Sequence, residues 1–478
     1  MENSGAEGSS RTLLSDSPRL DNDEMEDEID HIARQIAEED WSSTHEDGQY
    51  TRRWKRRVDS KYKRVSDKND AYKDDEEKQS EAPSEPTSSI DPVRDISDLV
   101  EGLLPIYHQQ ISIAAGLSFF SDSVEIIATF FLAIQVNENN LQSAVIVASI
   151  FLGILTGTFF VTKLGNIFGK YRVYCATTVL LPVVGTLTLL AEDFQTMAMA
   201  RFFVGFAASG RVLAFQVLDE FSTKSRPSVW IHTQFYWSTG VILVVFLASI
   251  TDWMNMIFIL EIFVAVASFI SMALMFESPS WLLEQGDVEK IVLFFSERSG
   301  PGFNCIIEIK PNTEVSVCKS EKWMLWILWF FFGVLYYGSI YMVHDMYYND
   351  RDYYGTIVVC AEIEIIGIFI GWFGINHIGS RWTQMLGFSL AANGIFFLDV
   401  YQDHATIPIV AAAATRFGLM AAGTASLLHA ESSSLASPIS FCMSYLGGVV
   451  GPLLVESSFG VIISSVVLQI IISLHYFL

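Results

Sequence analysis

Long apolar runs fill the chain from Ile111 onward and restrict the folds that it can adopt. A helix needs about 20 apolar residues to cross a hydrocarbon core of about 30 Å, where it must satisfy its own backbone polar groups. Core helices of large soluble proteins rarely run this long without charge. Twelve such runs occur, near 111–135, 141–163, 172–191, 195–218, 228–250, 255–276, 322–346, 353–375, 382–401, 405–428, 436–456 and 458–478. The sequence therefore predicts an all-α membrane protein with twelve transmembrane helices.

Basic residues between these runs fall almost wholly on alternate loops. They are Lys163, Lys170, Arg172, Lys224, Arg226, Lys290, Arg298, Lys310, Lys319, Lys322 and Arg381. The intervening loops carry only Arg351. Because loops rich in Lys and Arg stay on the cytoplasmic side of a membrane, we expect both termini to be cytoplasmic.

Residues 1–90 are polar and carry a large share of the formal net charge of -24. Self-repelling acidic segments stay solvated, so we expect an acidic, mostly disordered cytoplasmic tail that is available to protein partners. Its dense basic cluster at 52–57 fits contact with an anionic lipid leaflet, or a solvated charge run neutralised by its acidic flanks. The apolar spacing of residues 91–110 predicts an amphipathic helix along the membrane surface.

A short polar turn occurs twice, each time between two apolar runs. It reads Gly165–Asn166–Ile167–Phe168–Gly169–Lys170–Tyr171–Arg172 in the first copy and Gly374–Ile375–Asn376–His377–Ile378–Gly379–Ser380–Arg381 in the second. A later run opens at Arg201 and ends at Glu220, and its counterpart opens at Arg416 and ends at Glu431. Signals that recur in one order are typical of a duplicated bundle. We expect a first bundle at 91–276, a cytoplasmic linker at 277–321 and a second bundle at 322–478.

Ionisable residues inside the runs are candidates for function. Asp122 and Glu125 are three residues apart and share a helix face. A carboxylate at mid-depth in lipid costs about 2.5 kcal/mol or more, so both should face the protein interior. Arg211 and Asp122 lie at similar depths, about 13 and 18 Å from the cytoplasmic end, and are close enough to pair. This pair is either functional or a neutral tie between two helices. Of Glu362 and Glu364, which point about 200° apart, we expect Glu364 to face the cavity.

Several motifs together resemble the major facilitator superfamily. They are Ser121–Asp122–Ser123–Val124–Glu125, the two Asn–x–x–Gly turns, Arg201 followed by Asp219–Glu220–Phe221, Glu277–Ser278–Pro279, Trp281–Leu282–Leu283, Tyr336–Tyr337–Gly338 and Glu364–x–x–Gly367. Within it, the likeness is to synaptic vesicle glycoprotein 2 and the synaptic vesicle two-related proteins, with the organic-ion transporters behind them. The resemblance implies two pseudo-symmetric six-helix bundles that alternate access to a central cavity. It implies that the first, fourth, seventh and tenth spans line that cavity, with Asp122, Glu125, Arg211, Tyr336, Tyr337 and Glu364 binding the substrate or a coupling ion.

The resemblance also implies a cytoplasmic gate built on the turns. Its residues here are Asn166, Gly169, Lys170, Arg172, Arg201, Glu220, Asn376, Gly379, Arg381, Arg416 and Glu431. The superfamily carries Asp where this chain has Asn166 and Asn376. A neutral amide keeps the hydrogen bonds of such a latch but loses its charge. The sequence therefore predicts a weaker gate, or a loss of transport.

The function that we predict is secondary transport of a small organic solute, an organic ion that is cationic or zwitterionic, across a vesicle membrane or the plasma membrane. Carboxylates and aromatic faces suit a cation; if Arg211 is paired with Asp122, Glu125 is left as the free acid. A proton or a sodium ion is the candidate coupling ion. The alternative is a non-transporting vesicle protein that binds partners through its tail. The sequence predicts no cofactor, metal site, nucleic-acid partner or enzyme, since it has no Walker loop, metal-spaced His/Cys set or nucleophile elbow.

Overall fold

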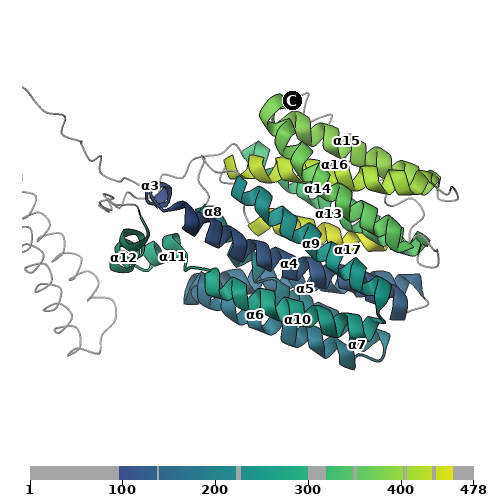
Figure 1. Cartoon of the computed structure of the whole chain (residues 1–478), viewed down its shortest axis with the longest axis horizontal. Coiled ribbons are helices and arrows are strands. Elements are labelled where there is room, and N and C mark those ends of the chain that lie inside the picture. Colours follow the sequence, from purple (N-terminus) through teal and green to yellow (C-terminus); the bar gives the residue numbers. More distant parts are fainter. Residues whose placement is uncertain are drawn as a thin grey trace, which may run out of the picture. The chain divides into compact units, whose positions relative to one another are not determined.

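A computed structural model describes residues 96–136, 139–221, 228–299, 319–347, 353–401, 404, 406–432 and 438–455. The acidic tail with its basic cluster, residues 300–318 of the linker and the predicted span at 458–478 lie outside these residues, as do Lys224, Arg226 and Arg351. The described part is almost entirely helical (Figure 1).

The first bundle runs from α3 (Ile96–Glu101) to α10 (Trp253–Leu274). Between them lie α4 (Pro105–Val136), α5 (Asn140–Phe168), α6 (Lys170–Leu187), the short 3-10 helix η1 (Thr188–Leu190), α7 (Phe194–Ala208), α8 (Arg211–Glu220) and α9 (Ser228–Ile250). The predicted fourth span is thus two helices, interrupted at Ser209–Gly210. Gly210 packs so closely on Thr177 of α6 that a β-carbon would collide with its hydroxyl. The interruption places Arg211 at the start of α8.

Two short helices, α11 (Pro279–Glu284) and α12 (Val288–Arg298), follow the first bundle. The second bundle contains α13 (Lys319–Tyr347), α14 (Tyr353–Ile378), α15 (Ser380–Val400), α16 (Ile407–Ser432) and α17 (Pro438–Val455). Within the described residues, nine helices are long and apolar enough to cross a membrane when α7 and α8 are taken together, and the apolar α17 is shorter.

Of the predicted surface helix at 91–110, the structure describes residues 96–110, which form two helices. The described helix α3 ends at Glu101, and α4 begins at Pro105, six residues before the predicted span. Leu99, Val100 and Leu103 are buried in the hydrophobic core, and the backbone N–H of Leu104 donates to the carbonyl of Arg298. The apolar face of α3 is therefore covered by protein, which a helical pattern alone cannot distinguish from lipid.

The second glycine of each predicted turn adopts the same conformation. Gly169 and Gly379 have φ values of 100° and 89°, in the left-handed region that favours glycine. Each donates its N–H back to the first glycine of its motif, Gly165 or Gly374, and the next residue begins a helix. The repeat seen in the sequence is therefore a repeat of backbone structure.

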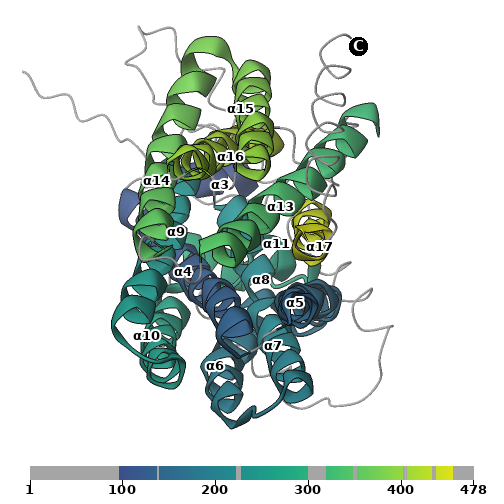
Figure 2. The same ribbon diagram turned by 90° about the vertical axis from the view of Figure 1, so that its right-hand side faces the viewer.

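The contacts between the bundles repeat in the same way. Helix α5 packs on α17, and α9 packs on α14 (Figure 2). Helices α5 and α17 are the second and eleventh predicted spans, and α9 and α14 are the fifth and eighth. The eighth span is the counterpart of the second, and the eleventh is the counterpart of the fifth, so the two contacts are equivalent. This is the pseudo-symmetry of a duplicated bundle.

Helices α5 and α7 cross with their backbones almost touching. A β-carbon at Gly205 would collide with the carbonyl oxygen of Ile150, and one at Gly153 with that of Phe202. Small residues that permit such an approach are a common basis of helix packing in membranes.

We therefore expect Gly205→Ala to destabilise the purified protein by about 1–3 kcal/mol, because the helices must separate. Gly355→Ala in α14 is the control, since a β-carbon there meets no atom within 4 Å. Thermal unfolding in detergent provides the measurement. Equal melting of the two variants would show that the crossing has more room than the structure indicates.

Candidate functional site

A central cavity lies between the two bundles, lined by α4, α8 and α9 from the first and by α13, α16 and α17 from the second. It contains about 590 Å³ of empty space, counted with the solvent at its mouth. Eight of its lining residues are aromatic: Phe119, Trp237, Trp329, Phe332, Tyr336, Tyr337, Phe441 and Tyr445. The first, fourth, seventh and tenth spans line the cavity, as expected, and the fifth and eleventh (α9 and α17) contribute as well.

Arg211 is the charged residue in this lining. Its Nε lies 2.8 Å from Oδ2 of Asp122, so the pair predicted from helix depth is present. Its guanidinium donates to the hydroxyl of Tyr445 and lies 5.0 Å from the ring centroid of Phe119 and 5.9 Å from that of Trp237. Asp122 is turned away from the central cavity and lines a smaller one inside the first bundle.

Glu125 is not the free acid that we predicted. Its Oε2 lies 3.1 Å from Nη1 of Arg201, and both side chains are almost fully buried. Arg201 also donates to the hydroxyl of Thr188, and the carboxyl group of Glu261 of α10 lies beside that of Glu125. Glu125 therefore belongs to a closed cluster of Arg201, Thr188 and Glu261, outside the central cavity.

Arg416 forms the matching pair in the second bundle. Its Nη1 lies 2.7 Å from Oε1 of Glu364, and the same oxygen accepts a hydrogen bond of 3.1 Å from the hydroxyl of Tyr336. Trp237 of the first bundle in turn donates to that hydroxyl at 2.7 Å. Glu364 is buried and Glu362 is exposed, as the helix geometry predicted. A chain of hydrogen bonds thus joins the bundles behind the cavity wall.

Arg201 and Arg416 were predicted to be gate residues, and the structure contradicts both. Arg201 lies near the start of α7, at the opposite end of the fourth span from Glu220, and Arg416 is buried within α16. The motif gave the order of Arg and Glu along the chain. A helix rises about 1.5 Å per residue, so residues at its two ends lie far apart. Each Arg therefore pairs with a buried acid instead.

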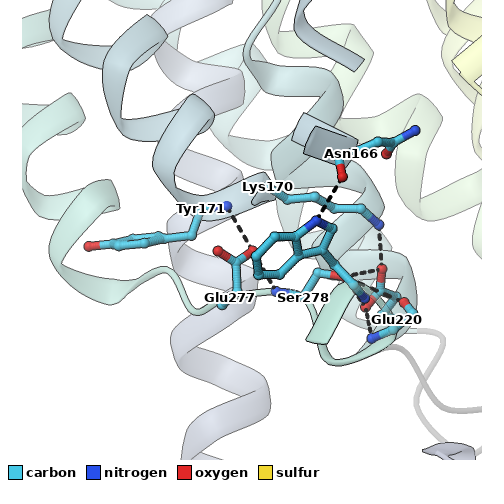
Figure 3. Close-up of polar contacts among 8 residues, drawn as sticks. Asn166, Lys170, Tyr171, Glu220, Glu277 and Ser278 are labelled. Atoms are coloured by element: carbon cyan, nitrogen blue, oxygen red, sulfur yellow. Dashed lines mark hydrogen bonds and ion pairs between the residues drawn. The ribbon is translucent and has the colours of Figure 1, made fainter. Parts of the chain in front are cut away.

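The first polar turn does carry a latch, centred on Glu220 (Figure 3). Lys170 forms an ion pair with Glu220 at 2.6 Å. The hydroxyl of Ser278 donates to the same carboxylate at 2.7–2.8 Å, and the backbone N–H of Ser280 donates to it at 3.2 Å. This latch holds the start of α11 against the ends of α6 and α8.

A second carboxylate, Glu277, caps the turn itself. Its Oε1 accepts hydrogen bonds of 3.0 Å from the backbone N–H groups of Tyr171 and Ser278. A β-carbon at Gly169 would lie 2.6 Å from its Oε2, so glycine is required there by space as well as by φ. Glu277 came from a recognised motif, but sequence reasoning gave it no role in the gate.

The side chains of Asn166 and Asn376 are exposed and lie outside the latch centred on Glu220, so their gating role stays a prediction. The indole N–H of Trp281 donates to the backbone carbonyl of Asn166 at 2.9 Å, while the side chain of Asn166 is exposed and turned away from Glu277 and Glu220 (Figure 3). The amide of Asn376 donates to the carbonyl of Trp372 in its own helix. Any residue type supplies a backbone carbonyl, so replacing Asp by Asn does not remove these contacts.

The second turn is built differently. Ser380 donates to the carbonyl of Ala425 at 3.0 Å, and a β-carbon at Gly379 would meet no atom within 4 Å. Arg381 is exposed, like Arg172 in the first turn. The side chain of Glu431 lies outside the described residues. The first turn is covered by α11, and this cover accounts for the difference.

At the other end of the helices, contacts join the two bundles. Asn140 donates to Asp345 at 3.0 Å, and the hydroxyl of Tyr341 donates to the backbone carbonyl of Asn140 at 2.8 Å. The ring of His344 packs on Phe130 and Phe131, with centroids 5.7 and 4.7 Å apart. Sequence reasoning missed these residues and the cavity residues Trp237 and Tyr445, because their partners lie in the other bundle.

Removing one partner of a buried ion pair leaves an unpaired charge. We expect Arg201→Ala to destabilise the protein by about 3–5 kcal/mol, measured by denaturant titration in mixed micelles. Adding Glu125→Gln should recover part of the loss, since the stranded charge is then gone. The exposed pair Lys290–Asp287 supplies a control, and Lys290→Ala should cost no more than about 1 kcal/mol. A double variant no more stable than Arg201→Ala would contradict this account.

Loss of the Glu220 charge should loosen only the segment that the latch holds. Glu220→Gln removes the charge that holds Lys170, Ser278 and Ser280, so amide hydrogen exchange of residues 277–285 should become faster. Glu284→Gln, at an exposed position of α11, should leave it unchanged. Equal exchange in both variants would show that α11 is held by packing alone.

Curated proteins that are similar to this chain include solute carriers and transporters. Solute carrier family 22 member 1 of Bos taurus is 25% identical over 335 residues, which are 64% of this chain and 58% of that protein. Organic cation/carnitine transporter 2 of Rattus norvegicus is 23% identical over 279 residues, or 52% of this chain and 48% of that protein. The chain spans about half the length of the curated relatives it matches. The predicted likeness to organic-ion transporters is thus confirmed, and that to synaptic vesicle proteins stays a prediction.

Among solved structures, the xylose transporter XylE from E. coli, in a partially occluded inward-open conformation, aligns with a TM-score of 0.60 at 15% identity. The alignment covers 77% of this chain and 96% of that one. The fold is therefore the major facilitator fold. The sugar (and other) transporter family matches residues 114–436. Because this match spans more than half of the chain, the protein belongs to the sugar (and other) transporter family and is a multi-pass membrane protein.

Proposed function

We propose that the protein is a secondary transporter that moves a small cationic or zwitterionic organic solute by alternating access. The observation that carries this proposal is the aromatic lining of the central cavity. Ring faces attract cations, most strongly where water is excluded, with about 2 kcal/mol for a desolvated contact. Membership of a transporter family supports transport, and a relative named for organic cations and carnitine supports the solute class.

The charges around the cavity fit this solute. Arg211 is balanced by Asp122, and Arg416 is balanced by Glu364 behind Tyr336. The lining is then close to neutral, and the ring faces can act on a positive nitrogen. A zwitterion adds a carboxylate, for which Arg211 and the hydroxyl of Tyr445 are the matching groups.

The arrangement of contacts supports alternating access. Asn140, Tyr341 and Asp345 tie the bundles together at one end, whereas the contacts centred on Glu220 stay within the first bundle and α11. We take the latch end as cytoplasmic because its loops carry the basic residues. The structure then represents a state closed on the side away from the cytoplasm. Opening that side requires the contacts of Asn140 with Tyr341 and Asp345 to break.

The test is uptake by purified protein in proteoliposomes. The solutes are tetraethylammonium as a cation, carnitine as a zwitterion, p-aminohippurate as an anion and xylose as a sugar. We expect uptake of the first two. Uptake confined to the anion or the sugar would overturn the solute class, and no uptake of any solute would favour the non-transporting alternative.

A tryptophan exchange tests the role of the rings. Trp329→Ala removes a ring from the cavity wall, and uptake of tetraethylammonium should fall about tenfold or more, as expected for losing a desolvated cation–π contact. Trp372→Ala is the matched control, because this tryptophan is exposed on the outer face of α14. Equal uptake by both variants would show that the solute does not contact the aromatic wall.

A further inference from the structure

The contact that joins the two bundles on the side away from the cytoplasm, here called the outer end, contains a histidine. Tyr341, His344 and Asp345 are three and four residues apart, so they share one face of α13. Tyr341 and Asp345 bind Asn140 of α5, whereas His344 packs on α4. We propose that His344 is a pH sensor in this contact, and that acid on the outer side opens the cavity to that side.

The imidazole of His344 is enclosed between the bundles. Its exposed fraction is 1%, and the rings of Phe130 and Phe131 in α4 lie against it, with centroids 5.7 and 4.7 Å away. On the second-bundle side, Tyr354 of α14 stacks on Phe131 with a centroid distance of 6.3 Å. The imidazole is thus part of the surface that the bundles share. The outer end can open only by exposing it to water.

The packing of His344 fits the neutral form of the side chain. Its Nδ1 lies 2.9 Å from the carbonyl oxygen of Ile340 in the same helix. Because a carbonyl oxygen only accepts hydrogen bonds, Nδ1 carries the proton of the neutral ring, and a second proton would go to Nε2. That atom is buried. A charge placed there would lose its hydration, which is costly.

The described charged groups near His344 add to this cost or are engaged elsewhere. Arg416 of α16 acts on the ring through its positive charge, which disfavours a second cation, and is itself paired with Glu364. Asp345 is the next residue of α13, but it is exposed and accepts a hydrogen bond from Asn140. Protonation of His344 is therefore easier in water than in the closed contact.

The closed and open states then differ in the number of protons that they bind. An imidazole in water takes up a proton at about pH 6.5. The preference for the closed state is complete above that pH, and it is lost as the pH falls below it, because only the open state gains the proton. From about pH 7.5 to 5.5, one histidine of this kind changes the ratio of open to closed molecules roughly tenfold.

Acid on the outer side would therefore present the cavity to an acidic compartment, and a neutral solution would leave it closed. The control of transport by this opening rests on the function proposed above. The opening itself does not, since it follows from the contact between the bundles. The test accordingly measures the outer end directly, without any solute.

Spin labels report the distance between the outer ends of the bundles. They are attached in the full-length chain through Gln195→Cys at the start of α7 and Thr406→Cys just before α16, both exposed positions, after the five native cysteines are replaced by alanine. In nanodiscs, the ratio of the longer to the shorter distance should rise roughly tenfold from about pH 7.5 to 5.5. The same measurement with Asn140→Ala weakens the outer contact and brings the open state into the measurable range.

Four variants identify the titrating group. His344→Gln keeps a polar side chain that does not titrate, so its distances should not depend on pH. His344→Phe fills the same apolar space with a neutral ring and should stay closed at both pH values. His404→Gln, an exposed histidine at the outer end, is the matched control and should keep the full response. Asp345→Asn should keep it as well, since the sensor is the imidazole.

The outcomes separate the sensor from the transport function. Distances that do not depend on pH, with and without Asn140→Ala, would overturn the sensor. So would a response that persists in His344→Gln or His344→Phe, or one that is lost in Asp345→Asn. Opening by acid without uptake of any solute would refute the proposed function and keep the sensor. Uptake by a protein whose outer end does not respond to pH would do the reverse.

Discussion

Charge pairing inside the helices is the constraint on which the rest of this structure depends. An ionised side chain within a bilayer needs a partner, and the described part of each bundle meets this need with buried Arg–carboxylate pairs. Glu125–Arg201 ties α4 to α7, Asp122–Arg211 ties α4 to α8, and Glu364–Arg416 ties α14 to α16. Removing one member would leave the other unpaired in a medium without water. The positions of these helices are thereby coupled to one another.

The three pairs are not equivalent in their surroundings. Arg201 lies in a closed polar cluster of Glu125, Thr188 and Glu261. Arg211 is different, because aromatic rings of both bundles surround it and its contact with Asp122 is poorly aligned. The Glu125–Arg201 contact is a hydrogen bond as well as an ion pair, and such a contact holds two helices in one arrangement. The contact of Arg211 with Asp122 is an ion pair alone and lies at a cavity, and for this reason the functional interpretation centres on Arg211.

Sequence reasoning reached the fold because its signals are local. The length of the apolar runs, the turn glycines Gly169 and Gly379, and the depth match of Asp122 with Arg211 all follow from helix geometry. The assignment of Glu125 failed because a shared helix face does not say which neighbouring helix packs against it. The contacts of Asn166 and Asn376 were not predicted, because a backbone carbonyl makes the contact in one case and a bond within the helix in the other. The roles of Trp237 and Tyr445 could not be predicted, since each depends on a hydrogen-bond partner about a hundred or more positions away in the chain.

The interruption at Ser209–Gly210 divides the fourth span into two segments with different attachments. On one side of it, α7 is anchored through Arg201 to a fully enclosed cluster, and its close crossing with α5 leaves little freedom. On the other side, α8 carries Arg211 at its first residue and Glu220 at its last, so one short rigid rod ends at the cavity and at the latch. Ser209 and Gly210 both keep right-handed helical dihedral angles, so the backbone passes from α7 to α8 through one tighter turn. One membrane span therefore carries an enclosed ion pair before this turn and, after it, the two charges that contact the cavity and the latch.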